Sequence, residues 1–147
     1  MEMICKNLNK DRLLAISIGL VYLWFGALKF FPGLSPADAL AKDTIHHLTF
    51  GLIPSDVSII LLAIMEVLIG ACLVFCVQIK KTIVLALAHI TMTFTPLLFF
   101  PELSFNSAPF TLTLVGQYIM KNIIIISALL MLYPVDKKTY TDPAVSV

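Results

Sequence analysis

Charged residues are scarce in this chain. They make up 13% of it, whereas they account for about a quarter of an ordinary soluble domain. Hydrophobic residues make up 59%, and the mean hydropathy is +0.96, which together exclude a typical soluble fold. The basic residues are scattered and the net charge is only +1, so the basic face of a nucleic-acid-binding protein is also excluded. We expect a lipid bilayer around the chain and no nucleic-acid partner.

Cysteine is scarce as well. The three cysteines, Cys5, Cys72 and Cys76, form no CxxC pair and no cluster with histidine at metal-ligand spacing. Their odd number argues against a complete disulfide framework. We therefore expect no metal site, and we expect Cys72 and Cys76 to be reduced residues that share one face of an apolar helix.

Long apolar runs, by contrast, occupy most of the chain. A helix needs about 20 apolar residues to cross a bilayer, and runs near this length cover residues 13–31, 57–77, 82–100 and 111–133. No length remains for a soluble domain, so we expect an all-α fold, a single membrane domain of four transmembrane helices. The first run is too long for a typical signal-peptide core, and we expect it to be retained as a span.

Basic residues outside the spans predict the orientation, because Lys and Arg are retained on the cytoplasmic side. The first and third loops together hold only Lys42. The two tails and the second loop hold the others, which are Lys6, Lys10, Arg12, Lys80, Lys81, Lys137 and Lys138. We expect both termini to lie in the cytoplasm.

The first loop contains a predicted short amphipathic helix between Ser35 and Leu52, on the extracytoplasmic side. Ser35 is a suitable N-cap, and Pro36 suits the first helical position. An imperfect apolar stripe follows, made of Leu40, Ile45, Leu48 and Leu52. His46 and His47 are adjacent, so they should point in different directions, which disfavours a shared ligand site.

Four ionisable residues interrupt the spans: Lys29, Glu66, His89 and Lys121. Such groups are costly in lipid, by about 2.5 to 3.5 kcal/mol for a central Asp, Lys or Arg, and they mark functional sites. At about 1.5 Å per residue, Glu66, His89 and Lys121 each lie about 14 to 16 Å below the outer end of their spans. They should meet near the midplane, and our preferred contact is an ion pair between Glu66 and Lys121.

Other polar residues are spaced so that they can join these groups. Gln117 is one helical turn from Lys121, Asn122 and Tyr118 lie on flanking faces, and Thr93 is one turn from His89. On the first span, Tyr22 and Lys29 share a helical face with glycines that permit close helix contact. Lys29 either extends to the outer interface or turns toward Glu66. The predicted polar pocket consists of Glu66, Lys121, His89, Gln117, Lys29, Tyr22 and Asn122.

Several motifs indicate a family. They are the Gly-x-x-Lys-Phe pattern within residues 24–33, the segment 48–51, the Glu-x-x-x-Gly of residues 66–70, and residues 116–122. In these motifs the chain resembles the DoxX-like family of small bacterial four-span membrane proteins, over residues 12–133. The resemblance implies a four-helix bundle in the bacterial cytoplasmic membrane. It also implies a link to redox chemistry, since the name-giving relatives are connected with thiosulfate and quinones.

Three functions remain open from the sequence. The first is a membrane-embedded binding or partner subunit whose midplane pocket holds a small lipophilic or redox ligand such as a quinone. The second is a transporter or channel for a small solute or a proton, and the third is a structural subunit whose buried ion pair sets helix register without a ligand.

The chain carries no cofactor fingerprint and no separate catalytic domain. We therefore expect it to act as a partner rather than as an enzyme alone. If it takes part in catalysis, the resemblance implies a place in a quinone-linked oxidoreductase system, with a membrane redox partner or a second copy of the chain beside it.

Overall fold

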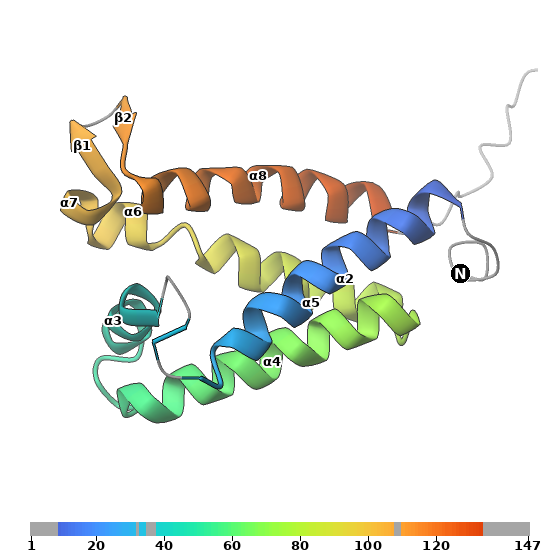
Figure 1. Ribbon diagram of the computed structural model, residues 1–147, viewed down its shortest axis with the longest axis horizontal. Coiled ribbons are helices and arrows are strands. Elements are labelled where there is room, and N and C mark those ends of the chain that lie inside the picture. The colour runs from blue at the N-terminus through green and yellow to red at the C-terminus, as the bar shows by residue number, and fades with distance from the viewer. Residues whose placement is uncertain (1–8, 32, 35–37, 108–109, 134–147) are drawn as a thin grey trace, which may run out of the picture.

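Four long apolar helices form the bundle seen in the computed structural model (Figure 1), which describes residues 9–31, 33–34, 38–107 and 110–133. The elements in chain order are α2 (Lys10–Leu28), α3 (Asp38–Leu48), α4 (Ser55–Phe75), α5 (Ile79–Met92), α6 (Pro96–Phe99), α7 (Pro101–Ser104), β1 (Phe105–Ser107), β2 (Thr111–Leu112) and α8 (Leu114–Leu132). The segments long enough and apolar enough to cross a membrane are α2, α4, α5 together with α6, and α8. The predicted all-α bundle of four spans is confirmed.

The helices begin and end where local hydrogen bonds allow it, and these points differ by a few residues from the apolar runs. The Asn9 side chain accepts a hydrogen bond from the Arg12 backbone N–H at 2.8 Å, so the charged first turn belongs to α2. Thr113 caps α8 in the same way, accepting from the Gly116 N–H at 3.1 Å. The last span consequently starts at Leu114 rather than at residue 111, because Thr111 and Leu112 pair with β1 in a short antiparallel hairpin.

The third span is interrupted near its far end. Helix α5 stops at Met92, and α6 begins at Pro96, whose ring nitrogen has no hydrogen to donate. Within the break, the Met92 carbonyl that Pro96 cannot bond accepts from the Thr95 hydroxyl at 2.8 Å, and the Thr93 hydroxyl donates to the Ile90 carbonyl at 2.6 Å. The break leaves the Thr93 oxygen available to a neighbouring helix.

Helices α2 and α4 pack closely through glycine. A Cβ placed on Gly70 would lie 2.7 Å from the Gly19 carbonyl oxygen and 2.8 Å from the Leu23 backbone nitrogen. A Cβ on Gly26 would lie 3.0 Å from the Glu66 Cβ. Small residues therefore permit this contact, as the sequence predicts for membrane helices.

The two ends of the bundle differ in packing. At the end where α2 begins and α8 ends, here called the terminal end, the interior is aliphatic (Figure 1). Its most deeply buried side chains include Ile69, Leu73, Ile83, Leu129 and Leu132, which are at most 2% exposed. The opposite half, here called the α3 end, holds the buried ionisable residues and the hairpin.

Helix α3 confirms the predicted amphipathic helix in the first loop, although Ser35 and Pro36 lie outside the described residues. Its outer side carries Lys42, which forms ion pairs with Asp38 at 3.3 Å and Asp56 at 3.4 Å. Hydrogen bonding and attraction to these carboxylates, Asp38 first, raise the pKa of Lys42 despite the smaller opposing effect of desolvation.

The two histidines of α3 lie in separate environments. The His47 ring stacks on Phe99, with 6.1 Å between centroids, and meets Phe100 edge-on. The His46 ring packs against Gly51, and its plane is at 88° to that of His47. Within the described residues no group of three His, Cys, Asp or Glu side chains is placed to hold a metal ion. The histidines therefore pack the loop against the bundle.

The cysteine expectation is correct for one residue and wrong for the other. Cys72 in α4 is a free thiol. Cys76 is disulfide-bonded, and it ends α4 in a left-handed backbone conformation with φ of 56°. A count of cysteines gives no information on which residues chain folding brings together.

Candidate ligand-binding site

A cavity of about 600 Å³ opens in the α3 end of the bundle. Side chains from α2, α3, α4, α5 and α8 line it, and most of its wall is apolar. The apolar face of α3 contributes Leu40, Ile45 and Leu48, which explains why a loop helix carries an apolar stripe. The volume lies in the range of small-molecule sites, about 300 to 1,000 Å³.

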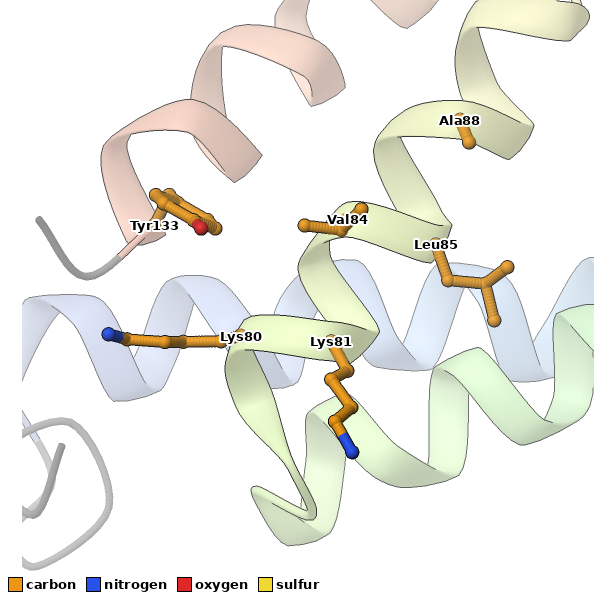
Figure 2. Close-up of a pocket in the computed structure, with 6 residues that line it drawn as sticks. All are labelled: Lys80, Lys81, Val84, Leu85, Ala88 and Tyr133. Carbon is orange, nitrogen blue, oxygen red and sulfur yellow. The ribbon is translucent and has the colours of Figure 1, made fainter.

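A second hollow of about 400 Å³ lies at the terminal end, between α5 and the end of α8. In Figure 2, Tyr133 and Val84 lie on either side of it, and the Lys81 side chain extends away from both. Apart from two lysines and the Tyr133 hydroxyl, its wall is apolar. We assign the candidate site to the larger cavity, because polar side chains converge there.

The central contact of the cavity joins Lys29 to Glu66. Lys29 Nζ lies 2.6 Å from Glu66 Oε2, and the two side chains are only 8% and 9% exposed. Lys29 follows the last residue of α2, and its ammonium also lies 3.4 Å from the Phe25 carbonyl oxygen one turn back. The structure therefore selects the inward of the two predicted orientations of Lys29, with its charge compensated inside the bundle.

His89 extends this contact on the other side of the carboxylate. Its Nε2 lies 3.4 Å from Glu66 Oε1, and its Nδ1 lies 3.1 Å from the Tyr22 hydroxyl oxygen. A neutral imidazole that carries its proton on Nε2 satisfies both contacts, because Nδ1 then accepts from Tyr22 and Nε2–H points at the carboxylate. In this arrangement the one Tyr22 hydroxyl hydrogen is donated to His89 rather than to the Ala86 carbonyl oxygen, which lies slightly farther away at 3.3 Å.

A further polar contact joins α8 to the break in the third span. Asn122 donates from Nδ2 to the Thr93 hydroxyl oxygen at 2.8 Å, and both residues line the cavity. Asn122 is thus placed at the cavity, as predicted. Thr93, one helical turn from His89, was also expected to line the pocket, and it does line the cavity.

The predicted ion pair between Glu66 and Lys121 is wrong. Glu66 is already bound by Lys29 and His89. Lys121 is exposed at the edge of the cavity, and its Nζ lies 5.3 Å from the centre of the Tyr118 ring. Depth along a helix indicates level but not neighbours: α4 packs chiefly on α2, whereas α8 packs chiefly on α5.

The prediction that Gln117 lines the pocket is also wrong. It is exposed and does not line the cavity, so we remove it from the candidate site. Its neighbour Tyr118 does line the cavity, as do Phe25 of α2 and Thr44 of α3. Tyr118 was expected there from its spacing. Phe25 was not, although it lies four residues before Lys29, and this helical spacing was the signal that identifies it.

This arrangement is suited to binding an oxygen-containing molecule inside an apolar wall. Lysine, asparagine and tyrosine supply donors, while Glu66 can accept a proton, including one from the Nε2–H of His89.

Comparisons with protein-family models, with curated proteins and with solved structures gave no match. The resemblance to the DoxX-like family stays a prediction that depends on motifs alone. In the structure, Lys29 of the first motif contacts Glu66 of another, and both lie at the candidate site.

Proposed function

We propose that this protein is a membrane-embedded binding protein or binding subunit whose cavity holds a small lipophilic molecule with an oxygen-rich head group. The observation that carries the proposal is the buried series Lys29, Glu66, His89 and Tyr22 at the wall of a largely apolar cavity. The DoxX-like resemblance makes a quinone the first candidate, with a membrane redox partner accepting or supplying electrons.

A binding role accounts for more of the polar residues than a purely structural role does. One ion pair between Lys29 and Glu66 would be enough to fix the register of α2 on α4. The chain also places His89 against the second carboxylate oxygen, and a separate contact between Asn122 and Thr93 borders the same space. Polar groups that converge on a cavity are the usual feature of a ligand site.

A continuous transport path is less well supported. A conducting pathway needs polar groups or water along its whole length. The little-exposed ionisable side chains Lys29, Glu66 and His89 lie at the α3 end, whereas the interior of the terminal end is filled by aliphatic side chains such as Ile83 and Leu129. We therefore favour binding from one side over passage through the bundle.

The location that we propose is the bacterial cytoplasmic membrane, with both termini in the cytoplasm. Lys10, Arg12, Lys80 and Lys81 belong to the terminal end, where α2 begins and where α4 connects to α5. Lys42 belongs to the α3 end and is paired with carboxylates. This distribution supports a cytoplasmic terminal end, although the disulfide-bonded Cys76 at the same end is unusual for that compartment. In the proposed orientation the cavity lies in the outer half of the bilayer.

Mass spectrometry of organic extracts from gently purified protein tests the proposal. We expect a stoichiometric lipophile with the wild type and at least a tenfold loss with Glu66→Gln, because the change removes the charge that organises Lys29 and His89. Glu102→Gln is the matched control, since Glu102 is exposed on α7 and outside the cavity. An empty wild type would contradict binding. If that empty wild type were also more stable than Glu66→Gln and as stable as Glu102→Gln, the result would favour a structural ion pair.

A further inference from the structure

The charges that line the cavity do not balance. Lys29 and Glu66 compensate each other at 2.6 Å, and the hydrogen bonds of His89 are satisfied by the neutral ring. Lys121 is then the remaining ionisable group of the lining. Within the described residues it forms no ion pair, and its ammonium contacts only the face of the Tyr118 ring. The described lining therefore carries one net positive charge.

Lys121 is deep in its span rather than at a membrane interface. It is the eighth residue of the 19-residue helix α8, which places it about 10 Å from the start of that helix. A cation at such a level is unfavourable in lipid unless an anion, water or the protein compensates it. The Tyr118 ring supplies only partial compensation, because a cation–π contact does not neutralise the charge.

The cavity opens toward lipid between α2 and α8. Its more exposed lining residues include Val21 and Phe25 of α2 and Leu114 and Tyr118 of α8, which are between 42% and 67% exposed. These two helices approach each other toward the terminal end and separate toward α3 (Figure 1). Lys121 lies at the edge of this opening.

We propose that the occupant of the cavity is a lipophilic organic anion, which enters from the bilayer between α2 and α8 and pairs its oxyanion with Lys121. This inference depends on the proposed binding function and specifies its ligand class. The apolar face of α3 and the walls of α2 and α8 accept the hydrocarbon part. A long-chain carboxylate and the enolate of a hydroxylated quinone share this chemistry, an oxyanion attached to a hydrocarbon tail.

The test compares ligands that differ only in the charge of the head group. The probes are oleate and oleyl alcohol, and a 2-hydroxy-3-alkylnaphthoquinone and its methyl ether. Binding is measured at pH 9 to the full chain in nanodiscs of phosphatidylcholine. We expect the wild type to bind at least one anion tenfold or more tightly than its neutral partner. Lys121→Met should abolish this preference, and Lys121→Arg should keep it.

Two controls separate the charge effect from damage to the fold. Lys81→Met removes an exposed lysine at the other end of the bundle, beside the hollow in Figure 2, and should keep the anion preference. Binding of the neutral probes should be the same in Lys121→Met as in the wild type, which reports an intact cavity.

The outcomes distinguish this inference from the function on which it depends. Equal binding of charged and neutral probes, unchanged in Lys121→Met, overturns the anion inference and leaves the binding function in place. No binding of any of the four probes, nor of the neutral quinone decylubiquinone, contradicts both. A Lys121-dependent preference for oleate identifies a fatty acid as the source, and one for the hydroxyquinone identifies a quinone; either result supports the inference.

Discussion

At the scale of single residues, Glu66 connects the polar side chains of the cavity. Its two carboxylate oxygens have different partners, Lys29 at 2.6 Å and His89 at 3.4 Å. A buried charge that loses its partner keeps the desolvation cost without the compensating attraction. The stability of the bundle and the shape of the site should therefore respond together to changes at this carboxylate.

Removing one member of the buried pair should cost more than removing both. We expect Lys29→Met to lower the free energy of unfolding by about 3 to 5 kcal/mol, because it leaves the Glu66 carboxylate buried without its cation. The double change Lys29→Met with Glu66→Leu should recover most of this loss, since an apolar pair of similar size fits the same space. Unfolding in mixed micelles measures both.

The same two variants separate stability from binding. Lys42→Met is the matched control, because its ion pairs lie on the surface of α3, where such pairs contribute little. If the stable double variant still copurifies with the wild-type amount of lipophile, the pair has only a structural role. We expect instead a stable protein with an empty cavity.

The sequence identified most side chains of the candidate site but not their partners. Ionisable residues inside apolar runs are conspicuous, and Glu66, His89 and Lys29 were found in this way. The helical rise per residue predicted their depth in the membrane, but which side chains meet depends on how α2, α4 and α8 pack. This is why Lys121 was assigned to the carboxylate that Lys29 binds.

At the scale of the helices, the contact between α2 and α4 positions this pair. Gly19 and Gly70 allow the two backbones to approach, and Gly26 lies against Glu66 itself. In lipid, packing of this kind replaces the hydrophobic effect as the source of helix association. The register of α2 on α4 therefore determines whether Lys29 reaches the carboxylate.

Gly70→Ala should weaken this contact. The added Cβ would lie 2.7 Å from the Gly19 carbonyl oxygen and 2.8 Å from the Leu23 backbone nitrogen, and neither backbone atom can move without moving its helix. We expect a loss of about 1 to 3 kcal/mol in the free energy of unfolding, typical of overpacking, and weaker retention of the ligand. Ser127→Ala, at an exposed position of α8, is the control; equal stability of the two variants would contradict a close glycine contact.

The elements themselves were largely predictable, because four apolar runs and an amphipathic loop segment have few alternatives in lipid. Their boundaries were not. The charged turn at Lys10 and Arg12 joins α2 through the Asn9 cap, and Thr111 leaves the last span to pair in a hairpin. Hydropathy measures transfer to lipid and does not register such local hydrogen bonds.

At the scale of the whole molecule, four spans place the start of α2 and the end of α8 at the same end of the bundle (Figure 1). The short connection between α4 and α5, with Lys80 and Lys81 directly after it, belongs to that end too. Orientation therefore depends on which side of the membrane retains these basic residues. The orientation also determines from which leaflet a ligand enters the cavity.

Reporter fusions should place the terminal end in the cytoplasm. We expect fluorescent protein to be bright when fused after Lys81, and alkaline phosphatase to be active when fused after Asn106 in the hairpin, because the lysines oppose translocation of the α4–α5 connection. Replacing Lys80 and Lys81 together by Gln should reduce the difference between the two sites. The reverse pattern would contradict the orientation and place the opening between α2 and α8 in the inner half of the bilayer, so that its ligand would come from the cytoplasmic leaflet.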